Sequence, residues 1–224
     1  MISSTAVLWM ALLSAEPHGH SGHGKHGNPA DLDEYVAKME APDRDAWQKP
    51  GEVIRALDVK PGQVICDIGA GPGYFALPLA RTVGEGGAVF AVDVEPRMLS
   101  VLRDRIAQSK LRNVAPVLSL PDDPLIPAGA CDLVLIVDTF HHFPDQTAYL
   151  RRLARSLRKG GRLANIDFHK KELPVGPPVE HKVSRDEFVI IATAAGFSVI
   201  AEPNFLPYQY FLILEPRAPK EQGR

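Results

Sequence analysis

The sequence predicts an α/β fold in which helices cover both faces of a mostly parallel sheet, and three observations carry this prediction. Short apolar runs rich in β-branched residues alternate with segments of helical periodicity, as in consecutive β-α-β units. These runs are nearly continuous in hydrophobicity, which is typical of strands that are buried on both faces. Of the 224 residues, 45% are hydrophobic and 23% are charged, a composition typical of a globular protein.

The strands are taken in chain order from these apolar runs. They are expected at residues 64–68, 88–92, 114–118, 133–137, 162–166, 198–202 and 209–215. The last two runs are only a few residues apart, too close for a crossover helix. We therefore expect them to be antiparallel to each other.

Helices are expected in the gaps between the early strands. One follows the first strand over residues 75–83, and another, over residues 97–108, carries apolar residues at helical spacing. A third helix is indicated by the stripe Leu150, Leu153 and Leu157. The glycine pair at 160–161 is expected to end it.

A last helix is predicted before the two C-terminal strands. Ser184 and Glu187 have the spacing of a capping box, and Gly196 is expected to end the helix. Its buried face is expected to consist of Phe188, Ile191, Ala192 and Ala195.

The composition divides the chain into a tail at residues 1–30, a single domain at 31–216 that begins with a helical cap, and a short C-terminal tail at 217–224. The apolar run at 6–15 is too short to span a bilayer, but it suits the hydrophobic part of a secretory signal. No Lys or Arg precedes it, and the cleavage pattern is poor. A cytoplasmic location is therefore expected, with export as the alternative.

Half of the histidines lie in the glycine-rich part of this tail. They are His18, His20, His23 and His26. Neutral imidazoles can bind Zn²⁺, Ni²⁺ or Cu²⁺, so a loose metal site is one interpretation. The favoured interpretation is a solvated linker with opportunistic affinity for divalent metals. No structural metal site is expected in the folded domain.

The net charge of −2 argues against nucleic-acid binding based on bulk charge, and no stable membrane insertion is expected. Two cysteines are too few for a disulfide framework or a thiolate metal site. Regular parallel strands would place Cys66 and Cys131 beyond the disulfide limit of about 7 Å. Both are expected to be reduced core residues.

The most informative segment is the glycine-rich turn that follows the first expected strand. Asp67 ends the strand, and Gly69, Gly71 and Gly73 lie in the turn before a helix. Glycines permit positive φ and let a ligand approach the main chain closely, while the helix N-terminus offers free N–H groups. The spacing differs from the Gly-x-Gly-x-x-Gly fingerprint, so a dinucleotide-dependent oxidoreductase is disfavoured.

Acidic residues also follow the next strands at the same edge of the sheet. Asp93 ends the second strand and can accept two hydrogen bonds from ribose hydroxyls, whereas Glu95 is interpreted as an acid at the start of the following helix. Asp122 and Asp123 lie in the loop after the third strand, where they suit either an adenine amino group or a Pro-Asp turn. Asp138 and the histidines 141–142 follow the fourth strand.

In this order, the motifs DIGAGPG, VDVEPRML, PDDP and LVLIVDTFHHFPD to LRKGGRLANIDF resemble the class I S-adenosylmethionine-dependent methyltransferases. The chain is most similar to their small-molecule branch, the type 11 or quinone-biosynthesis-like enzymes, from about residue 50 to 215. The resemblance implies a Rossmann-like three-layer sandwich with a seven-stranded, mostly parallel sheet, in the order 3-2-1-4-5-7-6 with an antiparallel last strand. Pro72, in place of Thr or Ser, and the PDDP loop depart from the usual motifs.

The resemblance also implies S-adenosyl-L-methionine as the cofactor and a set of residues that hold it. In such enzymes, the glycine turn surrounds the methionine part, Asp93 holds the ribose and the third-motif acid reads the adenine. The implied cofactor-binding residues are Asp67, Gly69, Ala70, Gly71, Gly73, Asp93, Val94, Asp122, Asp123 and Asp138.

The expected chemistry is an in-line displacement in which an acceptor atom attacks the sulfonium methyl group. If the acceptor is a phenol or enol, His141 or His142 can serve as the catalytic base, His141 being preferred. The alternative is a structural role in which one ring packs against the sheet. A degenerate domain that only binds a cofactor or metal is the alternative function.

Two segments are candidates to cover the crevice, residues 31–50 and 169–185. Neither is large, so a small or planar acceptor suits the chain better than a protein or a tRNA. In the first segment, Trp47 near Arg44 is expected either to line the site or to hold the N-terminal helix against the sheet. His181, in the second, is expected to be exposed.

Overall fold

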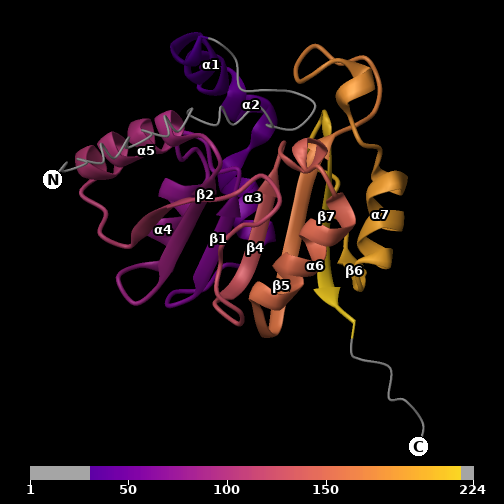
Figure 1. Cartoon of the computed structure of the whole chain (residues 1–224). Helices are drawn as coiled ribbons and strands as arrows, with labels where there is room; N and C mark the ends of the chain where they lie inside the picture. The colour runs from indigo at the N-terminus through magenta and orange to yellow at the C-terminus, as the bar shows by residue number, and fades with distance from the viewer. Residues whose placement is uncertain (1–30, 218–224) are drawn as a thin grey trace, which may run out of the picture.

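The computed structural model describes residues 31–217, which form a seven-stranded sheet between two layers of helices (Figure 1). The predictions about the apolar run and the histidines of residues 1–30 lie outside the described residues. The strands are β1 (Val64–Ile68), β2 (Ala88–Asp93), β3 (Val114–Leu118), β4 (Cys131–Val137), β5 (Leu157–Phe168), β6 (Phe197–Ala201) and β7 (Gln209–Pro216). The α-helices are α1 (Leu32–Met39), α2 (Arg44–Gln48), α3 (Pro50–Ala56), α4 (Ala76–Val83), α5 (Pro96–Ser109), α6 (Gln146–Ser156) and α7 (Arg185–Ala194).

The strand order β3-β2-β1-β4-β5-β7-β6 confirms the predicted topology. The pairs among β1 to β5 are parallel, and β7 is antiparallel to both of its neighbours. Since the parallel strands run in one direction, the loops that follow β1, β2, β4 and β5 meet at one edge of the sheet. Helices α1 and α2 lie over this edge (Figure 1).

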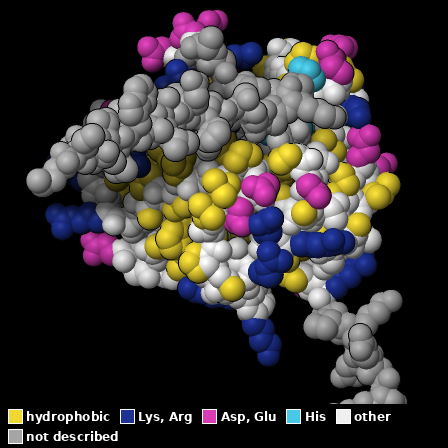
Figure 2. All heavy atoms as spheres, in the orientation of Figure 1, with side chains coloured by type: hydrophobic (Ala, Val, Ile, Leu, Met, Phe, Trp, Pro, Cys, Tyr) yellow, Lys and Arg dark blue, Asp and Glu magenta, His cyan; other side chains and the backbone are white. Residues whose placement is uncertain are grey.

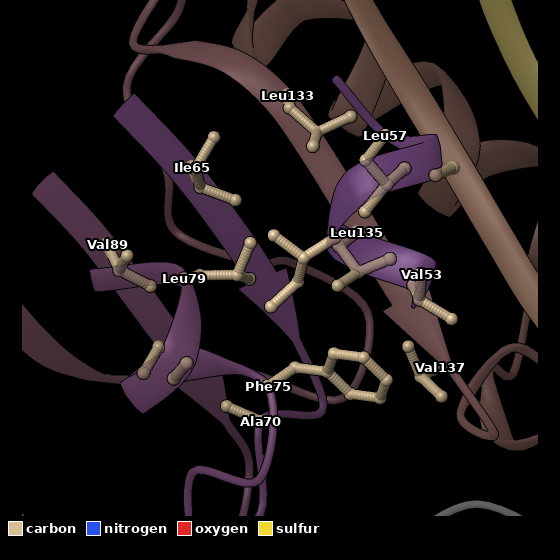
Figure 3. Packing of buried hydrophobic residues seen from close by; sticks show 14 of the residues in the cluster. Val53, Leu57, Ile65, Ala70, Phe75, Leu79, Val89, Leu133, Leu135 and Val137 are labelled. Carbon is tan, nitrogen blue, oxygen red and sulfur yellow. The ribbon is translucent and has the colours of Figure 1, made fainter. Parts of the chain in front are cut away.

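The hydrophobic core is divided into two layers by the sheet. Side chains alternate along each strand, so Ile65 packs with Leu79 of α4 on one face, whereas Ile68 belongs to the layer under α6 and α7 on the other. Figure 3 shows the first layer, where Val53 of α3 and Leu57, the residue that follows this helix, lie beside the strands. The three-layer sandwich is therefore confirmed.

Helix α7 begins as predicted, because Ser184 and Glu187 form a complete capping box. Phe188, Ala192 and Ala195 are buried, whereas Ile191 is only partly buried. The chain leaves the helix at Gly196, which has a φ of 97°. The local sequence therefore determines both ends of this helix.

The predicted end of helix α6 is wrong. The helix ends at Ser156, and Leu157 already belongs to β5, which runs through the glycine pair at 160–161. Pairing with β4 shifts within this stretch, so the extra residues form a bulge. A Cβ on Gly161 would lie 3.1 Å from the Cys131 carbonyl oxygen, so this glycine permits close approach of the strands rather than ending a helix.

The prediction that Cys66 and Cys131 are separate, reduced residues is also wrong. Both are fully buried, but they form a disulfide with their Cα atoms 6.0 Å apart. The prediction assumed that regular pairing of parallel strands keeps the two residues apart, whereas Cys131 is the first residue of β4 and precedes its pairing with β1, which begins at Leu133.

Candidate cofactor site

The glycine turn after β1 needs its glycines for conformation and for space. Gly69, Gly71 and Gly73 have φ values of 73°, 54° and 93°. A Cβ on Gly69 would collide with Thr139, and one on Gly73 would lie 2.6 Å from a methyl carbon of Leu102. The turn is therefore held against both the loop after β4 and helix α5.

Asp93 joins this turn to the loop after β2. Its Oδ2 accepts a hydrogen bond from the Gly71 N–H at 2.9 Å, and its Oδ1 accepts one from the Glu95 N–H at 2.9 Å. Burial raises the pKa of Asp93, although the backbone N–H groups of Glu95, Gly71 and Val94 oppose the rise. Each oxygen keeps a lone pair for a ligand hydroxyl. Glu95 itself caps α5 by accepting from the Arg97 N–H, in line with its predicted place at the helix start.

Asp67 lies beneath the turn and is only 3% exposed. Its Oδ2 is buried and has no hydrogen-bond partner among the described residues. Burial, followed by the charge of Asp93, raises the pKa of Asp67 to about 7, while Arg44 and the Ala76 N–H oppose the rise. An unpartnered buried carboxylate oxygen suits a site that is completed by a cationic or hydrogen-bonding ligand.

The N-terminal cap is attached directly to this turn. The Met39 methyl carbon lies 3.0 Å from where a Cβ on Gly71 would be, and Arg105 of α5 pairs with Glu40. The Arg44 guanidinium lies over the Tyr74 ring, 3.9 Å from its centroid. These contacts hold the segment after α1 against the glycine turn.

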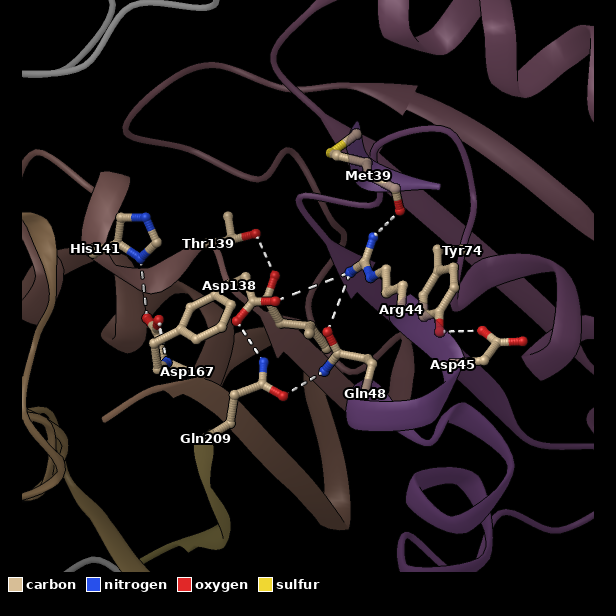
Figure 4. A network of polar contacts seen from close by, with 12 residues as sticks. Met39, Arg44, Asp45, Gln48, Tyr74, Asp138, Thr139, His141, Asp167 and Gln209 are labelled. Atoms are coloured by element: carbon tan, nitrogen blue, oxygen red, sulfur yellow. Dashed lines mark hydrogen bonds and ion pairs between the residues drawn. The ribbon is translucent and has the colours of Figure 1, made fainter. Parts of the chain in front are cut away.

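A polar network ties the cap to the other side of the crevice (Figure 4). Gln48 donates to Gln209 at 2.8 Å, and Gln209 donates to Asp138 Oδ1 at 2.7 Å. Arg44 donates to Gln48 at 3.4 Å, and its Nη2 lies 3.9 Å from Asp138 Oδ2. Burial and the charge of Asp167 raise the pKa of Asp138 to about 7, while Arg44 opposes the rise.

His141 pairs with an acid that the sequence reasoning missed. Its Nδ1 lies 3.2 Å from Asp167 Oδ2, and the two side chains are 5% and 0% exposed. Burial lowers the pKa of His141, but the hydrogen bond and charge of Asp167 more than offset this, so the pKa is raised. Asp167 directly follows a predicted strand, and this position at a strand end is the same signal that identified Asp93 as a candidate site residue. His142 is exposed, and its ring centroid lies 4.2 Å from that of His141.

Asp122 and Asp123 both face Arg152 of α6. Asp123 accepts from Arg152 at 2.5 Å and from the Leu125 N–H at 2.9 Å, whereas Asp122 lies 3.6 Å from Arg152. These contacts agree with the turn interpretation of the loop. Burial and the charges of Asp123, Asp93 and Asp122 raise the pKa of Tyr149, so the loop approaches the same region as Asp93.

The two proposed covers have different contacts. The Trp47 ring lies 5.7 Å from Phe168 and 6.3 Å from Tyr208, which agrees with a role in holding α2 against the sheet. In the other segment, Lys182 is 3% exposed and donates to the Lys171 carbonyl. His181 ends a short 3₁₀ helix (Val179–His181). The prediction that His181 is exposed is wrong, because its side chain is partly buried.

Within residues 31–217, no group of three or more His, Cys, Asp or Glu side chains could hold a metal ion. The same part of the chain has no helix that is both long enough and apolar enough to cross a membrane.

Comparisons with known proteins agree with this architecture. Residues 65–161 match a family model described as "Methyltransferase domain". Over 126 residues the chain is 34% identical to nocamycin O-methyltransferase from Saccharothrix syringae, covering 56% of this chain and 43% of that protein. It is 28% identical over 134 residues to demethylmenaquinone methyltransferase from Shouchella clausii, covering 58% and 54%. The chain spans about half the length of the curated relatives it matches.

A solved structure extends the similarity to most of the fold. The S-adenosylmethionine-dependent methyltransferase from Aquifex aeolicus superimposes with a TM-score of 0.78 at 27% identity, covering 83% of this chain and 98% of that one. The matched domain, the strand order and this superposition agree with one another. In sequence and in fold, the chain is therefore similar to S-adenosylmethionine-dependent methyltransferases.

Proposed function

We propose that this protein transfers a methyl group from S-adenosylmethionine to a small-molecule acceptor. The observation that carries the proposal is the pairing of the glycine turn with Asp93, whose carboxylate is oriented by the Gly71 and Glu95 N–H groups. The positive φ values of Gly69, Gly71 and Gly73 suit a turn that closes around a ligand, and the unpartnered Asp67 oxygen suits a cofactor that carries positive charge. When bound, S-adenosylmethionine supplies an electrophilic methyl group on a sulfonium sulfur.

The residues of the chain would bind and orient the reactants. Gly69, Ala70, Gly71 and Gly73 would line the methionine part of the cofactor, and Asp93 with Val94 would hold the ribose. Asp67 and Asp138, when ionised, would supply negative charge for the sulfonium. Asp122 and Asp123 remain candidates for the adenine amino group, although their contacts with Arg152 compete with that role. Alignment of this kind can supply roughly 7–11 kcal/mol of the barrier.

The acceptor is proposed to be small and planar. The names of the relatives indicate that their acceptors are nocamycin-related and quinone-related molecules, which supports this size class. The cap is short, and acidic and basic side chains are interspersed on the face shown in Figure 2, which does not suit a nucleic acid. We expect no nucleic-acid partner.

Calorimetry on the full chain tests the function. We expect S-adenosylhomocysteine to bind and NAD not to bind, followed by transfer of labelled methyl to a panel of small acceptors. Binding of Zn²⁺ alone would favour the alternative of a degenerate, metal-binding domain. Binding of NAD alone would favour an oxidoreductase.

A cytoplasmic location stays a prediction, with export as the alternative. The need for S-adenosylmethionine supports the cytosol, whereas the disulfide supports an oxidising compartment. Alkylation of free thiols in the protein taken directly from cells separates the two. Detection of two reactive cysteines after denaturation would support the cytosol, whereas detection of no reactive cysteine would support export.

A further inference from the structure

The segment between β5 and α7 contains a buried lysine. Lys182 is 3% exposed, and among residues 31–217 it is the only Lys or Arg side chain that is buried. Lysine side chains are almost never fully buried unless their charge is paired, because removing an ammonium group from water is costly. The partners of this ammonium are therefore informative about what the site binds.

The contacts of Lys182 within the described part of the chain do not neutralise its charge. Its Nζ donates a hydrogen bond to the Lys171 carbonyl at 2.8 Å and lies 5.9 Å from the centroid of the Phe168 ring. No acid among residues 31–217 forms an ion pair with it. An ammonium has three N–H donors, so a carbonyl and a ring leave at least one donor and the positive charge uncompensated.

The acids near the start of α7 are already paired with other cations. Glu187 lies 3.1 Å from the Lys170 ammonium. Glu202, just after β6, lies 2.6 Å from the Arg185 guanidinium. Neither acid can serve Lys182 without giving up its present partner, so a ligand is the natural source of the missing negative charge.

Lys182 lies where the two covers of the crevice meet. Figure 1 shows the segment between β5 and α7 over the same edge of the sheet as α1 and α2. Both covers contact Phe168, the last residue of β5. A Cβ on Gly176 of the segment would lie 2.9 Å from carbons of the Phe168 ring, and the Trp47 ring of the cap is 5.7 Å from it. An acceptor that enters between the covers would therefore approach Lys182.

A cavity adjoins the start of the segment. Its volume is about 280 Å³, and its lining residues are His169, Lys170, Lys171, Ser184, Arg185 and Asp186. Lys171 is also the residue whose carbonyl accepts from Lys182. A small charged group therefore has room close to the main chain that Lys182 contacts.

The single ammonium indicates which class of anionic group it receives. A carboxylate carries one negative charge and two oxygens that accept charge-assisted hydrogen bonds. A phosphate ester carries about −1.5 to −2 near neutral pH, which is more than one ammonium balances away from water. The neighbouring rings of Phe168 and Trp47 offer apolar contact area to a flat molecule.

We propose that Lys182 determines acceptor specificity, and that the acceptor is a ring-bearing molecule with a carboxylate that pairs with the Lys182 ammonium. This inference rests on the proposed function. The carboxylate is a recognition group, so it stays at Lys182 while a different atom of the acceptor attacks the sulfonium methyl group. The pair thereby orients the ring relative to the cofactor.

Two probes of similar shape test whether charge is recognised. Benzoate and benzamide are close in size, but only benzoate is charged near neutral pH. Calorimetry on the full chain, saturated with S-adenosylhomocysteine, measures the affinity of each. We expect wild type to bind benzoate at least about tenfold more tightly, the scale of one hydrogen bond to a charged group. Equal affinities, or binding of neither probe, would overturn the inference.

Variants then locate the charge. K182M keeps an unbranched side chain without the ammonium, so it should lose the preference for benzoate while its affinities for benzamide and S-adenosylhomocysteine stay within about twofold. K182R should keep part of the preference. K159M, which changes an exposed lysine near the start of β5, is the control. A preference that persists in K182M, or that is lost in K171M instead, would overturn the assignment to Lys182.

A purely structural role for Lys182 predicts a different result. If the ammonium only holds the segment through the Lys171 carbonyl, K182M should weaken the binding of both probes equally and lower the urea midpoint. That result would overturn the inference. The comparison of the two probes on wild type remains a test even if a variant loses the fold.

Transfer of labelled methyl to hydroxybenzoates and hydroxybenzamides adds a kinetic measurement. K182M should raise KM for the hydroxybenzoates at least about tenfold with a smaller change in kcat, because it removes binding of a part of the acceptor that does not react. A methyl ester as the product would overturn the inference, since the carboxylate would then be the reacting group. Failure of S-adenosylhomocysteine to bind wild type would instead defeat the proposed function.

Discussion

Arg44 Nη2 of the cap lies 3.9 Å from Asp138 Oδ2 at the end of β4, with both side chains mostly buried. The same guanidinium donates to the Met39 carbonyl at 2.6 Å and covers the Tyr74 ring. Arg44 therefore links the glycine turn, the cap and the loop after β4. Its positive charge also opposes the rise in pKa of Asp67 and Asp138.

Replacing Arg44 is expected to weaken cofactor binding. R44A removes the contacts that hold the cap over the site and leaves the buried acids without a nearby cation, so we expect about a tenfold loss of affinity, or about 1.4 kcal/mol. R44K keeps the positive charge but lacks the planar guanidinium group, so its affinity should lie between those of wild type and R44A. Calorimetry with S-adenosylhomocysteine measures the effect. R103A, on the exposed side of α5, is the control, and an affinity in R44A equal to that of R103A would contradict the role.

Asp93 is expected to contribute through its negative charge. D93A should weaken S-adenosylhomocysteine binding by about 1–3 kcal/mol, the scale of losing charge-assisted hydrogen bonds. Part of the loss would arise from the turn, because the Gly71 N–H loses its acceptor. D104A removes an exposed acid from α5 and serves as the matched control. An unchanged affinity in D93A would remove Asp93 from the site.

The disulfide is expected to stabilise the fold strongly. Cys66 and Cys131 are separated by 65 residues, and closing a loop of that length should stabilise the folded state by about 4 kcal/mol. Urea unfolding of wild type and of the C66A/C131A double variant measures the difference. A reductant during unfolding should lower the midpoint of wild type and leave the variant unchanged. Equal wild-type midpoints with and without reductant would rule out the bond.

Stability without the cofactor is expected to fall as the pH rises from about 4 to about 7. The folded pKa of Asp67 is about 7, against an ordinary value of 3.8, and that of Asp138 is also about 7. In this window the unfolded chain has lost these protons and the folded protein keeps them. The stability present below pH 4 is therefore lost as pH rises, by up to about 1.4 kcal/mol per pH unit for each group.

Urea unfolding at pH 5 and pH 7 measures how far the free energy of unfolding falls between these two pH values. Because the pKa of His141 is also raised in the folded protein, its titration lowers the stability in the same direction near neutrality. D67N cannot titrate, so its stability should fall less between the two pH values than that of wild type. D104N provides the exposed control. A wild-type slope retained in D67N would show that Asp67 is ionised in the folded protein at pH 5.

Several features could be predicted because they depend on residues close together in the chain. Ser184 and Glu187 cap α7 across a single turn, and the strands around Asp67 and Asp93 are recognisable from their own hydrophobicity. The end of α6 was misjudged because the helical stripe includes Leu157, whose backbone pairs with Cys131 instead. Here tertiary pairing outweighed local periodicity.

The sequence by itself determined the order of strands and helices, the glycine turn and the edge of the sheet to which the acids belong, since periodicity and capping act over a few residues. Only the tertiary structure decided that Cys66 bonds to Cys131, that Asp167 orients His141 and that Arg44 faces Asp138. These contacts depend on strand register and on the path of the loops. Both are set by how the whole chain packs, because displacements of a few ångströms decide whether such side chains meet.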